Sequence, residues 1–123
     1  MNDRRFKDGF RSLIAWQEAH KLTVAIYQAT RLFPRDELFG VTSQLRRASA
    51  SIGAQIAEGS RMSSSAHRRL YYERSYASGA EVDNFLELAF ELKYINEQSF
   101  EALISAVNKV SYLIKKLKDS LSE

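Results

Sequence analysis

Two histidines are the side chains in this sequence best suited to hold a metal ion or to move a proton. Helical bundles that bind two irons place a glutamate three residues before each histidine. Neither His20 nor His67 has one, and Glu18 precedes His20 by two residues. The periodicity places His20 on an apolar stripe, in the core or at an interface, and His67 in a solvated helix start.

Other catalytic groups are also missing from the pattern. The chain has no cysteine, which removes disulfides, thiolate metal ligands and a cysteine nucleophile. It contains no recognisable glycine-rich phosphate loop or nucleophile–base set. We therefore expect no enzyme: no catalytic residue, no metal, no cofactor and no small-molecule substrate.

Arginines are the remaining candidates for chemistry, because a guanidinium can bind a phosphate through two hydrogen bonds. Residues 46–74 hold six arginines against two glutamates, whereas residues 81–101 hold six acids against one lysine. Tyr71 and Tyr72 add surfaces on which bases could stack. The residues expected to bind nucleic acid are Arg46, Arg61, Arg68, Arg69 and Arg74, together with Lys7 and Arg11.

The same charge pattern has two other interpretations. The basic and acidic stretches can be two solvated faces, which is what charge runs usually are. They can also be complementary surfaces between copies of the chain, with the arginines paired to a neighbour's acids and the tyrosines in the core. The sequence leaves these alternatives open.

Helical periodicity dominates the 123 residues, and the chain has only five glycines and one proline. We expect helices over about 12–33, 41–58, 65–94 and 96–121, with Ser12 and Asn96 as caps. The loop PRDELFG before the second helix can hold one helical turn, with Asp36 as its cap. Short links between long helices predict an all-α, up-down-up-down antiparallel four-helix bundle. Residues 1–9 form a flexible N-terminal arm, and residues 10–121 form a single domain.

The stretch QLRRASASIGAQIAEGSR, residues 44–61, has three faces at helical spacing. An apolar stripe faces the core (Val41, Leu45, Ala48, Ile52 and Ile56). A small face around Gly53 makes room for a close neighbour (Ala50, Ala54 and Ala57), and Gly59 ends the helix in the left-handed conformation. A structural polar layer consists of Arg47, Gln55, Glu58, Ser78 and Glu81.

Within that layer we expect Arg47 to meet Glu81 in a partly buried pair that sets the register between two helices. Glu58 lies near the chain reversal, within reach of Arg61 or Arg68. In the third helix, seven residues are expected to face inward (Leu70, Tyr72, Tyr76, Ala80, Leu86, Ala89 and Leu92).

Four segments of the sequence carry a family resemblance: FRSLIAWQEA, IYQATRLFP, ELFGVTSQLRRASASIGAQIAEGSR and ASGAEVDNFLELAFELKYI. They resemble the four-helix-bundle family encoded in the intervening sequences of bacterial large-subunit ribosomal RNA genes. The core signature falls on residues 44–59, a second patch on residues 78–95, and the resemblance covers Phe10 to Ile95. Two positions depart from it. Gln55 stands where the family has Asn, and Lys93 where it often has Gly, which predicts that the third helix runs on.

The resemblance implies a homopentameric ring and a distant similarity to the accessory variability proteins of retroelements, which assist a reverse transcriptase and bind nucleic acid. We therefore expect a non-enzymatic homo-oligomer that binds RNA or another nucleic acid. The alternative is a protein–protein scaffold, or an accessory subunit for a reverse transcriptase or a ribosome-associated partner, without nucleic-acid contact. No signal segment or membrane-spanning run is evident, so we expect a cytoplasmic protein and no membrane partner.

Overall fold

The computed structural model describes residues 9–121, which form four α-helices and two short 3-10 turns and contain no strand. The helices are α1 (Ile14–Thr30), α2 (Val41–Ser60), α3 (Ser65–Glu91) and α4 (Glu97–Asp119), and the turns are η2 (Gly9–Ser12) and η3 (Arg35–Glu37). The predicted all-α fold with four helices is confirmed. Apart from Gly9, the predicted arm over 1–9 lies outside the described residues. Between residues 9 and 121, no helix is long and apolar enough to cross a membrane.

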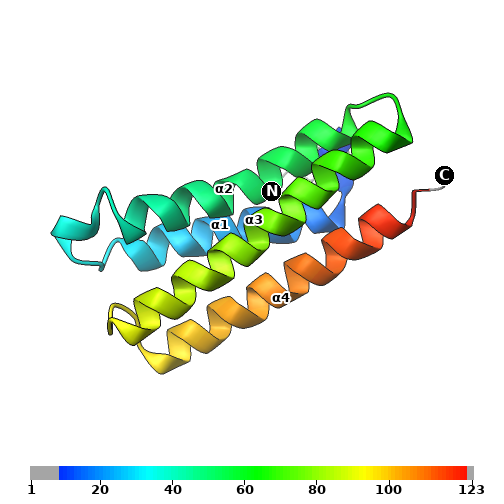
Figure 1. The fold of residues 1–123 in the computed structure, drawn as a ribbon. Coiled ribbons are helices and arrows are strands. Elements are labelled where there is room, and N and C mark those ends of the chain that lie inside the picture. The colour runs from blue at the N-terminus through cyan, green and yellow to red at the C-terminus, as the bar shows by residue number, and fades with distance from the viewer. Residues whose placement is uncertain (1–8, 122–123) are drawn as a thin grey trace, which may run out of the picture.

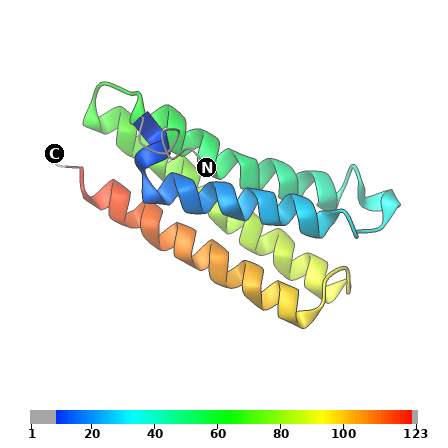
Figure 2. The ribbon, with the colours of Figure 1, turned by 180° about the vertical axis from the view of Figure 1, so that it is seen from behind.

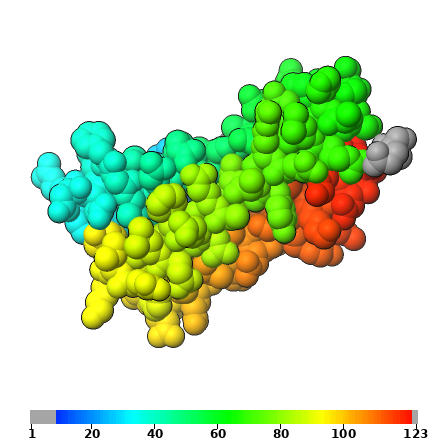
Figure 3. Space-filling model, viewed as in Figure 1, coloured from blue at the N-terminus to red at the C-terminus, as the bar shows by residue number. Residues whose placement is uncertain are grey.

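The four helices lie side by side, with α1 and α3 each between α2 and α4 (Figures 1 and 2). Hydrogen bonds set the register of α2 and α3, which run in opposite directions: the Ser51 and Ser78 hydroxyls are 3.0 Å apart, and Ser75 donates to the Ile52 carbonyl at 2.8 Å. The α2–α3 link therefore lies at the same end as the start of α1 and the end of α4. The space-filling view shows this link beside the end of α4 (Figure 3).

The core draws on all four helices. The predicted apolar stripe of α2 is fully confirmed, since all five of its residues are buried. The prediction for α3 is wrong at four positions, because Leu70, Tyr76, Ala80 and Leu92 are exposed. The buried face of α3 instead begins with Tyr72, is small in the middle (Ser75, Ser78 and Gly79) and is apolar over its second half (Val82, Leu86 and Ala89).

Small residues on that face let the neighbouring helices approach. The Ser75 side chain spans the distance to an α2 carbonyl by itself. A Cβ added to Gly79 would lie 3.1 Å from the Ser111 hydroxyl of α4. Larger residues on this face would hold α3 away from its neighbours, and Leu70, Tyr76 and Leu92, which the sequence suggested as core, are turned outward.

Three predicted helix ends differ in the structure. Ser12 belongs to η2 and bonds to Gly9, so α1 starts two residues later. The predicted turn in the loop is present as η3, but Asp36 lies inside it, and the residue at its cap is Pro34. A carboxylate for the start of α2 comes from Glu37, whose Oε1 accepts from the Val41 N–H at 3.1 Å. Gly59 lies within α2, and its backbone is not left-handed. The Asn96 cap is confirmed, because its side chain accepts from the Ser99 N–H at 2.7 Å.

The end of α3 corrects the prediction made from Lys93. The helix stops at Glu91, and Lys93 takes a left-handed φ of 66°. The Lys93 N–H donates to the Phe90 carbonyl, and the Tyr94 N–H donates to the Ala89 carbonyl, each at 2.9 Å. This pair of bonds is the Schellman motif, in which glycine is the preferred residue because it has no Cβ to clash. The backbone at this position has the left-handed conformation that glycine usually adopts, although the residue is a lysine.

Replacing Lys93 with glycine should therefore stabilise the protein by about 1 kcal/mol, because the left-handed conformation costs an L-residue that order of energy. Urea unfolding at neutral pH measures the change. Lys93→Ala is the matched control, since it removes the amine but keeps the Cβ. Equal stability of the glycine and alanine variants would contradict the explanation.

A hydrogen bond between loops closes the other end of the molecule. The Tyr94 hydroxyl donates to Glu37 Oε2 at 2.7 Å and joins the segments before α2 and before α4. This bond, together with the Val41 N–H, lowers the pKa of Glu37. A carboxyl whose folded pKa is lowered contributes stability above its unfolded pKa, and this contribution is lost as the pH falls through the folded pKa.

Tyr94→Phe should accordingly be less stable than the wild type at pH 7, and the difference should shrink as the pH falls below the ordinary glutamate value of 4.5. The Val41 bond to Glu37 is present in both proteins, so the comparison isolates the tyrosine hydroxyl. Urea midpoints of both proteins at pH 7 and pH 3 measure it. A difference that does not change with pH would contradict a role for the Glu37 carboxylate.

Candidate nucleic-acid interface

The helix arrangement sorts charge along the long axis of the molecule. The half that contains the α2–α3 link, residues 9–21, 52–77 and 109–121, has ten Lys and Arg against four Asp and Glu. We call it the basic half. The other half, residues 22–51 and 78–108, has five Lys and Arg against eight Asp and Glu, and we call it the acidic half. The structure adds the α4 lysines to the basic half, which the sequence analysis did not include (Lys109, Lys115, Lys116 and Lys118).

Four of the five predicted phosphate ligands lie in the basic half. Arg61 ends α2 and is exposed. Arg68 donates its Nε proton to the Met62 carbonyl at 2.7 Å, which closes the α2–α3 link. Arg69 donates to the Leu121 carbonyl, just after the end of α4, at 3.0 Å. Arg74 is exposed, one turn further along α3.

Arg46, the fifth, is separated from them. It lies fifteen residues before Arg61 on α2, or about 22 Å along the axis. Its Nε donates to the Thr30 hydroxyl at 2.8 Å, and its guanidinium carbon lies 4.9 Å from the centre of the Tyr27 ring. Arg46 is therefore held against α1 in the acidic half. The predicted Lys7 lies outside the described residues, whereas Arg11 is exposed in the basic half.

The two adjacent tyrosines have different surroundings. Tyr72 is a core residue, and burial raises its pKa although the nearby Arg68 charge lowers it in part. Tyr71 is half-buried, with the guanidinium of Arg74 5.2 Å from its ring centre. Gly59 lets both rings approach α2, because a Cβ there would lie 2.8 Å from a Tyr72 ring carbon and 2.9 Å from the Tyr71 Cβ. The glycine at this position is required by packing rather than by backbone angle.

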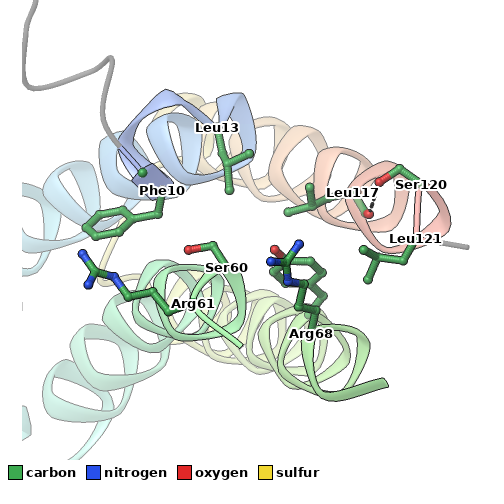
Figure 4. Close-up of a pocket in the computed structure, with 10 residues that line it drawn as sticks. Phe10, Leu13, Ser60, Arg61, Arg68, Leu117, Ser120 and Leu121 are labelled. Carbon is green, nitrogen blue, oxygen red and sulfur yellow. Dashed lines mark hydrogen bonds between the residues drawn. The ribbon is translucent and has the colours of Figure 1, made fainter. Parts of the chain in front are cut away.

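A pocket of about 420 Å³ lies among the helix ends of the basic half (Figure 4). Figure 4 shows Phe10 and Leu13 on one side, Leu117 and Leu121 on another, Arg68 between Ser60 and the leucines, and Arg61 extending toward Phe10. Ser60, Ser120, Tyr72 and Gly9 complete the lining. No sequence motif marks this pocket, because its walls come from four segments that only folding brings together.

The predicted polar layer is only partly assembled. Arg47 forms an ion pair with Glu81 and also donates to Gln44. The two charged side chains of that pair are 56% and 38% exposed, so it lies at the surface, where ion pairs contribute little to stability. One turn along α2, Gln55 donates to the Ser51 hydroxyl at 2.7 Å, and Ser51 meets Ser78.

Two members of the layer lack the expected partner. Within residues 9–121, the buried Oε1 of Gln55 accepts no hydrogen bond. Glu58 is exposed and forms no ion pair with Arg61, Arg68 or any other residue in the same part of the chain. The structure thus pairs Arg47 with Glu81, separately joins Gln55 to Ser78 through Ser51, and leaves Glu58 apart.

The structure also shows where the small face of α2 and the two histidines lie. A Cβ added to the buried Gly53 would lie 3.5 Å from the Trp16 indole nitrogen, so its close neighbour is α1 of the same chain, while Ala50 and Ala54 are exposed. His20 is exposed rather than in the core, and it stacks on Trp16 at 4.8 Å between ring centres.

His67 is exposed as predicted, and its Nδ1 lies 2.9 Å from the Ser64 hydroxyl. In the chain from 9 to 121, no cluster of three or more His, Cys, Asp or Glu is placed to hold a metal ion.

Comparison with known proteins gives a family match and matches among solved structures. The family model described as 23S rRNA-intervening sequence protein matches residues 11–116. A crystal structure of a protein of unknown function from the S23 ribosomal protein family of Bacteroides thetaiotaomicron is similar with a TM-score of 0.78 and 20% identity. The similarity covers 87% of this chain and 100% of that one and concerns the fold. Comparison with curated protein sequences gives no match.

Proposed function

The chain belongs to the 23S rRNA-intervening sequence protein family, and we propose that it is a non-enzymatic RNA-binding protein that acts through its basic half. Its subunit is an up-down-up-down antiparallel four-helix bundle, which assembles in the cytoplasm into a homo-oligomeric, pentameric ring. The observation that carries the proposal is the excess of ten basic over four acidic side chains in the basic half. Such an excess attracts polyanions and releases their counterions on binding.

The surroundings of individual arginines support this function. Within residues 9–121, the Arg61 guanidinium has no hydrogen-bond or ion-pair partner, so it can bind phosphate without breaking a contact in that part of the chain. Arg74 lies against Tyr71, whose half-buried ring is a surface on which a base can stack. Within residues 9–121, the ion pairs of this half join lysines to Glu18, Glu73 and Asp119 and leave the exposed arginines unneutralised.

Assembly of several subunits is supported by charge and by exposed apolar groups. The acidic half of one copy complements the basic half of another. Phe39 and Leu32, at the tip of the α1–α2 loop, are 91% and 86% exposed, and a soluble monomer gains nothing from apolar side chains held in water. A ring would repeat the basic half several times and increase the affinity for one RNA molecule through avidity.

Neutralising Arg61 and Arg74 together (Arg61→Gln, Arg74→Gln) should weaken binding of a structured RNA and lower the slope of log K against log salt by about 1.5, because each lost phosphate contact removes about 0.7–0.9. Fluorescence anisotropy with a labelled hairpin from 50 to 300 mM salt gives the slope.

The matched control neutralises Arg31 and Arg35, two exposed arginines of the acidic half. Its salt slope should equal that of the wild type. Absence of binding by the wild type at 50 mM salt, or a response that does not change with salt, would refute the RNA-binding function and favour a protein scaffold.

Sedimentation velocity tests the assembly separately. We expect the wild type to sediment as a pentamer at micromolar concentration. If the exposed loop tip lies in the subunit contact, Phe39→Ser should shift the distribution toward smaller species without loss of helicity, since Phe39 makes no core contact. A wild type that sediments only as a 14.1 kDa monomer would exclude the ring.

A further inference from the structure

The pocket of the basic half combines cationic, hydroxyl and apolar groups in one small volume. At about 420 Å³ it is within the size range of sites for single small ligands. Its walls come from η2, from the ends of α2 and α4 and from the start of α3, which all meet at one end of the molecule (Figure 4).

Two arginines provide its charge in different ways. Arg68 is anchored through Nε to the Met62 carbonyl, which holds the guanidinium in place and leaves its Nη groups for an anion. Arg61 lies at the rim beside Phe10, as Figure 4 shows, and is exposed. An anchored guanidinium loses little side-chain entropy when it binds a phosphate.

The hydroxyl of Tyr72 adds a hydrogen-bond donor to the pocket. The Tyr72 ring is buried, but its hydroxyl oxygen is not among the buried polar atoms that lack a partner in residues 9–121, so this oxygen is open to the pocket. A tyrosine commonly combines a buried ring with a polar end of this kind. Because Tyr72 lines the pocket, a ligand there can accept its proton.

The two serines act as acceptors. Ser60 donates to the Ala57 carbonyl at 2.8 Å and Ser120 to the Leu117 carbonyl at 2.6 Å, so each hydroxyl oxygen is left to accept a bond. Acceptors of this kind suit the amino and imino groups on the edge of a nucleobase. An aliphatic acid has no such donors, so its hydrocarbon part would leave the two serine oxygens without a hydrogen bond.

We propose that this pocket receives one unpaired nucleotide of the bound RNA, with its phosphate on Arg61 and Arg68 and its base between Phe10 and the leucines of α4. The proposal rests on the proposed function. It adds that the protein prefers RNA in which a base can turn out of the helix. Recognition of unstacked bases is a common way for proteins to distinguish RNA structures.

The test compares a fully paired RNA hairpin with the same hairpin carrying a single bulged nucleotide. The wild type should bind the bulged form about tenfold more tightly, as expected for one accommodated base. Leu117→Trp fills the pocket without changing charge and should abolish the preference while leaving affinity for the paired hairpin within about twofold. Tyr72→Phe should reduce the preference about threefold to fivefold through loss of one hydrogen bond.

Tyr112→Trp is the matched control, because it enlarges an exposed α4 residue outside the pocket and should keep the full preference. Circular dichroism verifies folding, and Ser120→Trp, which fills the pocket from its exposed rim, replaces Leu117→Trp if that variant unfolds. Equal binding of the two hairpins by the wild type would overturn the pocket proposal and leave RNA binding intact. A preference that survives in both folded, filled variants would also overturn it.

Failure of the proposed function gives a different result, in which the wild type binds neither hairpin. Titration with the four nucleoside 5′-monophosphates and with inorganic phosphate then decides on the pocket. Saturable nucleotide binding that is lost in Leu117→Trp and retained in Tyr112→Trp supports a nucleotide site. Absence of such binding, or a response equal to that of phosphate alone, overturns it.

Discussion

Close approach between α2 and α3 is the constraint on which the rest of the molecule depends. A serine hydroxyl of α3 reaches an α2 carbonyl directly, and the glycine near the end of α2 has no room for a Cβ beside Tyr71 and Tyr72. Helices packed this closely have few available registers, because side chains in the interface cannot be enlarged without moving a backbone. The polar contacts along the seam select one register, and the surface ion pair of Arg47 and Glu81 adds little energy to it.

Once this register is set, the positions of charge follow. The arginines of the α2–α3 link lie beside the start of α1 and the lysine-rich end of α4, and the acids of α3 and α4 lie at the other end. Like charges gathered in one half repel each other, so a bound polyanion or an acidic neighbour stabilises the folded chain. The concentration of basic charge on which the RNA-binding proposal rests is therefore a consequence of helix packing and not of any single motif.

The same packing creates the pocket. Tyr72 fills the space that Gly59 leaves, so its ring belongs to the core while its hydroxyl belongs to the pocket lining. Arg68 both closes the interhelical link and provides charge to the site. Groups that serve structure and binding together cannot be separated by deletion, so substitutions that fill space or remove one hydroxyl are more informative there than removal of an arginine.

By itself, the sequence determined the number of helices and the buried stripe of α2, because these depend on local periodicity. It did not identify the buried face of α3, where Ser75 and Gly79 replaced the larger residues, since the demand for small side chains arises from the neighbouring helices. It also did not show that Lys93 would turn as a glycine does. Only the tertiary structure separated Arg46 from the other arginines and brought Phe10, Arg68, Tyr72 and Leu117 together, because distances between residues far apart in the chain are set by the register of packed helices.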